Sequence, residues 1–379
     1  MKSIWVSIII FLSGCAPSHF RQSVRIGPDD WTLFGGSIER TNVANSILSP
    51  PLAVVWEYDA SAGFSPYSGA VADSFLFVGN LQGEIHTVQI ATGKVMGVYD
   101  FGSAIIGTPV IENDRMFVAL TKDEESLVCY TLLTGNIEWR AKIGEIETSP
   151  LLVGTHLFVT TLKGTLVCVD KKTGEIVWQY NVPVHKNPKM IFSSPASDGK
   201  LIVFGCDDGA LYTVGLDDGK LRWSAATGRS ILASPSISSG KIFFGSLDSM
   251  YYALDLETGK QLWKQRLGSK IYGSQSVSAN YVYVGTAGGE IFCLNVLTGA
   301  IIWNAAAKSV INSAPLLSGN ILYVGSLDKT LSAFDAESGK LVWQYKTEGR
   351  IKTMPIISKG FLFLFAEDKS VIAFKHSDH

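Results

Sequence analysis

The sequence of 379 residues has few of the residues that build metal and catalytic centres. It holds five cysteines and six histidines, with no Cys-x-x-Cys pair and no cluster of cysteine with histidine. It also contains no Gly-x-Ser-x-Gly segment, phosphate-binding loop or haem-attachment segment. The formal net charge is −2, so no overall field attracts nucleic acid. We therefore predict no catalytic residues, no metal, no cofactor and no nucleic-acid partner.

A long apolar run is also missing, because residues 4–12 are too few to cross a bilayer as a helix. This run follows Lys2 and ends in Leu12-Ser13-Gly14-Cys15, which indicates a targeting segment. The pattern resembles the signal of bacterial lipoproteins, in which the cysteine is acylated, with palmitate for example, and becomes the mature N-terminus. The resemblance implies a signal peptide over residues 1–14 and lipidation of Cys15. A plain secretory signal with a chance cysteine is the alternative.

The residue after Cys15 is Ala16, whereas an Asp there retains enterobacterial lipoproteins in the inner membrane. The resemblance therefore implies an outer-membrane protein on the periplasmic side, held in the membrane by its lipid alone. Residues 15–49 are predicted to form the tether and N-terminal segment, and residues 50–379 the folded domain.

What the sequence has in quantity is an internal period near 40 residues, and such a period indicates a repeat architecture. Within the repeats, a glycine is followed four residues later by a tryptophan six times. The pairs are Gly135/Trp139, Gly174/Trp178, Gly219/Trp223, Gly259/Trp263, Gly299/Trp303 and Gly339/Trp343.

One copy of the repeat contains short strand-like segments separated by tight turns. Residues 241–245, 250–254 and 261–265 are rich in aromatic and β-branched residues, and residues 233–238 lead into them. Four strands of about five or six residues with short turns use about 40 residues. The period therefore predicts a four-stranded antiparallel blade, and the fold class all-β.

Counting the copies predicts eight blades. In the first copy, Gly97 holds the position that tryptophan holds in the other copies, which we call the docking position. Trp56 lies one period upstream of it. The last copy, residues 354–374, supplies only three strands. We expect the strand around Trp56 to complete that blade and close the ring, which removes exposed sheet edges.

The tryptophans need no catalytic explanation, since each buries a large area against a neighbouring blade. The predicted structural tryptophans are Trp56, Trp139, Trp178, Trp223, Trp263, Trp303 and Trp343. Cys129, Cys168 and Cys293 share a repeat position that elsewhere holds Ala or Thr, which indicates a small core site and buried free thiols.

Residues 253–263, Ala-Leu-Asp-Leu-Glu-Thr-Gly-Lys-Gln-Leu-Trp, resemble the tryptophan-docking repeat of pyrroloquinoline-quinone-type (PQQ-like) propellers, and the resemblance covers about residues 50–375. With eight blades and a lipoprotein signal, the chain looks most like the BamB family of outer-membrane assembly lipoproteins. That resemblance implies a monomeric, non-enzymatic scaffold with protein partners in the cell envelope, such as the β-barrel assembly machinery.

The sequence departs from that family at its partner-binding segment. The family carries a Leu-Ser-Leu-Arg-Gly-like run there, whereas residues 188–195 are Pro-Lys-Met-Ile-Phe-Ser-Ser-Pro. Two alternatives stay open: a propeller that binds a small molecule or polysaccharide through its central channel, and a quinone-dependent dehydrogenase. The dehydrogenases resembling this chain carry adjacent cysteines and an acidic calcium site, and no two cysteines are adjacent here.

Two segments interrupt the period, and insertions on one face of a repeat fold are the usual binding side. One is the turn over residues 122–126, and the other is the link over residues 181–190. The candidate partner-binding residues are Lys122, Asp123, Glu124, Glu125, His185, Lys186, Lys189 and Met190. Ordinary variation of solvated loops explains the same pattern. Asp207-Asp208-Gly209 occupies a hairpin position, so turn chemistry explains it better than calcium.

Overall fold

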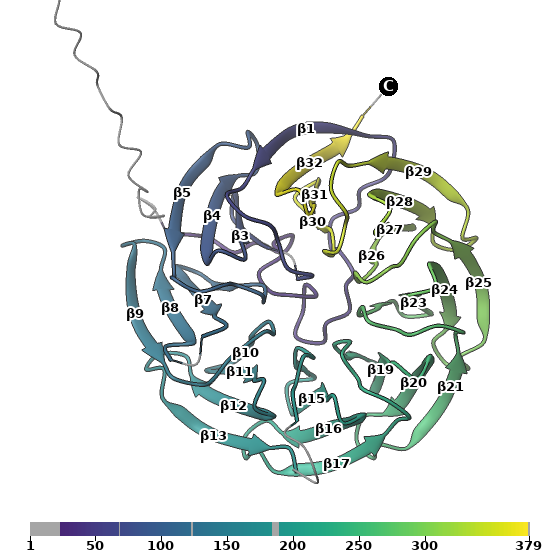
Figure 1. Ribbon diagram of the computed structural model, residues 1–379, viewed down its shortest axis with the longest axis horizontal. Helices are drawn as coiled ribbons and strands as arrows, with labels where there is room; N and C mark the ends of the chain where they lie inside the picture. Colours follow the sequence, from purple (N-terminus) through teal and green to yellow (C-terminus); the bar gives the residue numbers. More distant parts are fainter. Residues whose placement is uncertain (1–22, 68, 123, 184–188, 378–379) are drawn as a thin grey trace, which may run out of the picture.

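The computed structural model describes residues 23–67, 69–122, 124–183 and 189–377. Within these residues, β-strands form eight four-stranded antiparallel sheets, which stand as blades around one axis (Figure 1). The eight-bladed, all-β propeller predicted from the 40-residue period is confirmed.

The blades follow one another along the chain, and the first strand of each blade is the innermost. Their strands are, for blade 1, β2 (Ala70–Ala72), β3 (Phe75–Gly79), β4 (Glu84–Gln89) and β5 (Val95–Asp100); for blade 2, β6 (Val110–Glu112), β7 (Arg115–Ala119), β8 (Leu127–Thr131) and β9 (Asn136–Ala141); for blade 3, β10 (Leu151–Val153), β11 (His156–Thr160), β12 (Thr165–Asp170) and β13 (Ile176–Asn181); for blade 4, β14 (Ala196–Ser197), β15 (Leu201–Gly205), β16 (Ala210–Gly215) and β17 (Leu221–Ala226). They continue, for blade 5, with β18 (Ser236–Ser238), β19 (Lys241–Gly245), β20 (Met250–Asp255) and β21 (Gln261–Arg266); for blade 6, β22 (Ser276–Val277), β23 (Tyr281–Gly285), β24 (Glu290–Asn295) and β25 (Ile301–Ala306); for blade 7, β26 (Leu316–Ser318), β27 (Ile321–Gly325), β28 (Thr330–Asp335) and β29 (Leu341–Lys346); and for blade 8, β30 (Ile356–Ser358), β31 (Phe361–Phe365), β32 (Ser370–His376) and β1 (Leu52–Asp59).

Blade 8 is built from both ends of the chain. The N-terminal strand β1 pairs with β32 in antiparallel register, with Trp56 opposite Ala373. The predicted closure of the ring by the strand around Trp56 is therefore confirmed.

In every blade a small residue stands opposite the docking position on the outer strand. The pairs are Thr87/Gly97, Cys129/Trp139, Cys168/Trp178, Thr213/Trp223, Ala253/Trp263, Cys293/Trp303, Ala333/Trp343 and Ala373/Trp56. All these small residues are buried, and the cysteines among them are free, as is the buried Cys206. Burial raises the pKa of Cys129, Cys168 and Cys293 to about 12, so these thiols stay protonated and unreactive.

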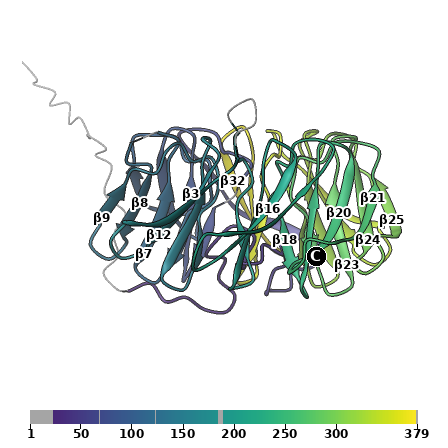
Figure 2. The ribbon, with the colours of Figure 1, turned by 90° about the horizontal axis from the view of Figure 1, so that it is seen from below.

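The antiparallel order gives the disc two different faces. Turns after the first and third strands of each blade lie on one face, which we call the lower face. Turns after the second strand and the links between blades lie on the opposite, upper face. Figure 2 shows the disc from its edge, with the purple N-terminal segment along the lower side.

The centre of the ring is occupied by residues 27–49, which Figure 1 shows as a purple trace between the innermost strands. This central segment bonds the blades in turn. Its backbone contacts are Trp31 with Val71, Thr32 with Ile111, Ile38 with Ser197, Glu39 with Ile237, Thr41 with Val277, and Asn42 with Leu317. Six blades are therefore tied to it by backbone hydrogen bonds, and the hydroxyl of Ser358 in blade 8 donates to Asp29 O.

Candidate functional site

The upper face has a funnel at the axis, formed by side chains from seven blade-to-blade links. The funnel has a volume of about 350 Å³ and is lined by Pro66, Tyr67, Ile106, Glu147, Phe192, Leu232, Tyr272 and Asn312. Burial, with a contribution from Glu145, raises the pKa of Glu147, the one carboxyl group in this wall. A wall that is mostly apolar and aromatic suits an apolar segment of a partner better than a highly charged one.

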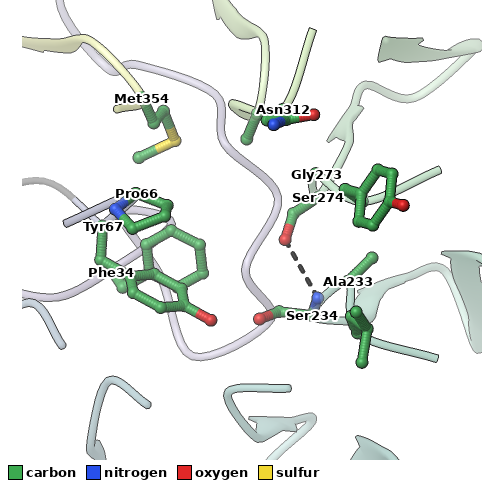
Figure 3. A pocket seen from close by; sticks show the side chains of 12 residues that line it. Phe34, Pro66, Tyr67, Ala233, Ser234, Gly273, Ser274, Asn312 and Met354 are labelled. Carbon is green, nitrogen blue, oxygen red and sulfur yellow. Dashed lines mark hydrogen bonds between the residues drawn. The ribbon is translucent and has the colours of Figure 1, made fainter. Parts of the chain in front are cut away.

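Tyr67 closes the floor of the funnel. Its hydroxyl donates a hydrogen bond to Phe192 O across the axis at 2.9 Å, and its ring meets Phe34 edge-on at 5.0 Å. The other links have small residues at this position, such as Gly107, Ala233 and Gly273. Figure 3 shows Tyr67 and Phe34 together on one side of the cavity, opposite Ser234 and Ser274.

A belt of hydroxyl groups surrounds this floor. The backbone N–H of each link donates to the serine hydroxyl of the next one, at 2.9 to 3.1 Å; the bonds run from Thr108 to Ser149, Ser149 to Ser194, Ser194 to Ser234 and Ser234 to Ser274. Ala314 and Met354 hold the equivalent positions in blades 7 and 8, so the belt ends there. A cavity of about 50 Å³ lies beside them, and Asn312 Oδ1 at its edge has no hydrogen-bond partner.

Arg40 fills the axis below the floor and is fully buried. Its guanidinium donates to Phe34 O within the central segment, to Ser149 O and Pro150 O in blade 3, and to Pro195 O in blade 4. Burial lowers the pKa of Arg40 to about 9, which leaves it protonated at neutral pH. The arrangement positions backbone carbonyls from two blades around one cation, and it closes the channel with the chain's own residues.

The predicted residues of the 122–126 turn are held by ion pairs on the upper face. Glu125 pairs with Arg140 and Lys122, and Glu124 pairs with Lys142. These pairs are solvent-exposed, so each contributes about 0 to 1 kcal/mol. Asp123 lies outside the described residues.

The predicted link between blades 3 and 4 approaches the funnel through Phe192. Met190 is exposed, and its N–H donates to Asp207 Oδ1. Lys189 O lies against Gly164 in the neighbouring turn of blade 3. His185 and Lys186 lie outside the described residues. The two predicted segments therefore share the upper face but belong to different blades, and the funnel that adjoins the second was not predicted.

The tryptophans lie at the seams between blades. At six seams the indole covers the glycine of the next blade's lower turn, and its Nε1 donates to the carbonyl three residues before that glycine at 2.8 to 3.2 Å; the donor–acceptor pairs are Trp56–Ile90, Trp139–Lys171, Trp178–Leu216, Trp223–Leu256, Trp263–Val296 and Trp303–Ala336. Five of the six glycines in the Gly/Trp pairs of the repeat thus lie under the tryptophan of the preceding blade. The exception is Gly135, because the preceding blade has Gly97 in place of the tryptophan.

One polar cluster was missed by sequence reasoning, at the seam between blades 8 and 1. Tyr58 Oη lies 2.6 Å from His86 Nδ1, while Ser61 Oγ and Glu84 Oε2 both face His86 Nε2 at 3.3 and 3.1 Å. A serine nucleophile needs the acid on the opposite ring nitrogen from the serine. The cluster therefore does not have a triad's geometry. No spacing in the sequence connects Tyr58 or Ser61 with His86.

The residues present do not fit a quinone cofactor with its metal. Within the described ranges, no group of three His, Cys, Asp or Glu side chains could hold a metal ion. In the eighth link, Lys352 holds the position that the funnel residues hold in the other links, and it is paired with Glu367. Arg40 below the floor is buried and already bonded to backbone carbonyls, so an anionic quinone in the funnel would meet apolar walls and Glu147. Among the same residues, no helix is long and apolar enough to span a membrane.

The closed ring, the four-stranded blades and the indole-over-glycine seams define a tryptophan-docking propeller of the PQQ-like class. Residues 47–142, 117–305 and 309–378 match the model of the family described as outer membrane protein assembly factor BamB. The chain belongs to this family.

Individual relatives are distant. An uncharacterised protein of Rickettsia prowazekii is 23% identical over 192 residues, which cover 45% of this chain and 45% of that protein. The BamB of Shewanella oneidensis is 22% identical over 125 residues, or 28% of this chain and 31% of that one. This chain therefore spans less than half the length of these curated relatives.

Solved structures share the fold. The crystal structure of BamB from Moraxella catarrhalis has a TM-score of 0.71 at 18% identity and covers 86% of this chain and 99% of its own. A quinohemoprotein alcohol dehydrogenase from Comamonas testosteroni has a TM-score of 0.78 at 13% identity, covering 93% and 81%. At these identities the likeness concerns the fold alone, since one fold hosts many functions.

Proposed function

We propose that this protein is a lipid-anchored, non-enzymatic scaffold that binds proteins of the cell envelope and assists the assembly of outer-membrane β-barrel proteins. Membership of the BamB family supports the role in β-barrel assembly, and the apolar funnel on the upper face supports the binding of a protein partner there. The observation that carries the proposal is the closed axis: Phe34, Tyr67 and Arg40 fill the space beneath the funnel, which leaves a shallow docking surface.

The residues that follow the proposed anchor support an orientation in which the upper face points away from the membrane. Val24 N donates to Asp114 Oδ1 and Arg25 N to Asp73 Oδ2, and both aspartates lie in turns of the lower face. If Cys15 is acylated, the nine residues from Cys15 to Val24 span at most about 30 Å. The lower face would then be held near the membrane, with the upper face directed away from it toward soluble partners.

A ligand that threads the channel, the binding alternative, has a physical obstacle. It would have to displace the Tyr67–Phe192 hydrogen bond and the buried Arg40 with its four acceptors. Buried polar groups left without partners cost about 1 to 3 kcal/mol each. A scaffold with a shallow funnel avoids this cost.

The test is crosslinking in intact cells with a photoreactive residue at position 272 on the funnel or at position 297 on the lower face, where Leu297 is also exposed. We expect position 272 to capture a component of the β-barrel assembly machinery and position 297 to capture much less of it. Tyr272→Glu should abolish capture from a neighbouring funnel position, while Leu297→Glu should not. Equal capture from both faces, or capture of no assembly component, would contradict the proposal. Cys15→Ser tests the anchor separately, because it should release the protein from the membrane fraction.

A further inference from the structure

One docking tryptophan lacks the glycine turn that covers its six equivalents. The turn that would cover Trp343 belongs between the third and fourth strands of blade 8. These strands are β32 and β1, which come from opposite ends of the chain, so no turn joins them. The residues there are Ser49, Pro50 and Pro51, which lead into β1, and Ser377, whose N–H donates to Pro51 O.

An open groove lies at this seam instead. It has a volume of about 320 Å³ and is lined by Ser49, Pro50, Pro51, Ile321, Val342 and Trp343. The indole of Trp343 packs edge-on against Phe374 of blade 8 at 5.9 Å, yet its Nε1 makes no hydrogen bond to any described residue. Val342 is 46% exposed beside it, and Ile47 is 73% exposed on the same lower side of blade 7.

The six covered seams define what such an indole binds. Each covering glycine has a φ between 62° and 76°, which side chains rarely adopt. A Cβ at these glycines would lie 2.4 to 2.8 Å from indole atoms, so only glycine fits over the ring. The carbonyl three residues earlier accepts the indole N–H. The contact thus combines close packing of a glycine on the indole ring, the left-handed conformation of that glycine, and one hydrogen bond from the indole N–H.

We propose that the groove at Trp343 is a second protein-binding site, which takes a tight turn of a partner protein with glycine in the left-handed conformation. The glycine lies over the indole, and the carbonyl three residues before it accepts the Nε1–H of Trp343. The aliphatic side chains of Val342 and Ile321 pack against the flanks of the turn. This site lies at the lower edge of blades 7 and 8, away from the funnel, and it does not depend on what the funnel binds.

The probe is a cyclised hairpin peptide with the sequence of residues 252–262, which holds the turn around Gly259 that covers Trp223 in this chain. Its matched control carries Gly259→Ala. The readout is the indole N–H resonance of Trp343 in the full domain, assigned by its loss in Trp343→Phe. We expect the glycine peptide to shift that resonance saturably and the alanine peptide to bind at least tenfold more weakly.

Variants of the protein complete the test. Binding to the variants is measured by the fluorescence anisotropy of a labelled peptide, because Trp343→Phe lacks the reporting resonance. Trp343→Phe keeps an aromatic ring without the N–H donor and should weaken binding of the peptide about tenfold or more, whereas Trp303→Phe at a covered seam should leave it unchanged. Val342→Lys is a second groove variant with an exposed side chain, so it should fold and still lose binding. No shift at Trp343, equal binding of the two peptides, or unchanged binding by both groove variants would overturn the proposal.

Two other occupants are distinguished by the same measurements. Binding that appears only after removal of residues 378–379 would assign the groove to the chain's own C-terminus and overturn a partner site. Self-association that Trp343→Phe abolishes would assign it to a second copy, with the same consequence.

Discussion

The outer ring and the centre of this propeller are held together by different means. The outer ring repeats one contact at six seams, an indole over a glycine turn with one hydrogen bond. The centre uses one non-repeating segment, residues 27–49, with Arg40 at the axis. The outer contact is redundant, since five seams remain when one is lost. The central contact exists once and touches several blades at the same time.

The difference also explains where the ring is irregular. Gly97 replaces the indole at the seam of blades 1 and 2, and Trp343 lacks its turn at the seam of blades 7 and 8. The N-terminal segment meets the ring at both places, with Val24 packed between blades 1 and 2 and Pro50-Pro51 beside Trp343. Departures from the repeat therefore collect where the non-repeating chain joins it.

Replacing the central cation should have the largest effect. Arg40→Met removes the donor to four backbone carbonyls that have no access to water, and a buried unsatisfied acceptor costs about 1 to 3 kcal/mol, so we expect a loss of about 4 kcal/mol or more. Arg40→Lys should recover only part of it, because an ammonium group has three donors and no planar fork. Urea unfolding of both variants measures this. A loss below 1 kcal/mol for Arg40→Met would show that the contacts of Arg40 are not essential for holding the blades together at the centre.

Breaking one seam should cost less than breaking the centre. Gly299→Ala places a Cβ 2.5 Å from the indole of Trp263 at a φ of 72°, so backbone strain and a clash add together. Gly240 has nearly the same φ, 70°, with no atom within 4 Å, so Gly240→Ala measures the strain alone. We expect about 1 kcal/mol for Gly240→Ala and about 2 to 3 kcal/mol for Gly299→Ala. Equal losses in urea unfolding would mean that the indole moves aside freely.

The sequence predicts the outer ring well because the same packing contact, and therefore the same residue pattern, recurs from blade to blade. Trp263 with Gly259 and Ala253 forms a pattern that recurs every 40 residues, and even the strand of Trp56 could be assigned to the last blade from it. The centre has no such signal. Tyr67 and Phe192 meet across the axis from links 125 residues apart. Arg40 binds backbone carbonyls, and every residue has a carbonyl, so no residue type in the sequence indicates its partners. The place of the segment from Trp31 to Thr41 inside the ring depends on contacts with blades far along the chain.

The irregular seam between blades 1 and 2 should respond to the segment that packs there. Val24 is buried in the cluster between these blades, whereas Ile26, two residues later, is 41% exposed. Val24→Ala should lower the free energy of unfolding by about 1 to 2 kcal/mol, and Ile26→Ala by less than about 0.5 kcal/mol. Urea unfolding compares the two variants directly. If Ile26→Ala costs as much as Val24→Ala, the burial of Val24 does not compensate for the indole missing at Gly97.

The smallest effect should be a pH dependence at the seam of blades 8 and 1, where both ends of the chain meet. Burial lowers the pKa of His86 below 6.5, and the neighbouring Glu84 offsets this only in part. The unfolded chain therefore takes up a proton near pH 6.5 while the folded protein does not, and stability falls as the pH decreases below that value. The urea midpoint should be lower at pH 5.5 than at pH 8, and His86→Gln should reduce that difference, because an amide does not titrate. A variant with the same pH dependence as the natural chain would show that the decrease comes from other groups, and that the polar seam is no more sensitive to acid than the indole seams.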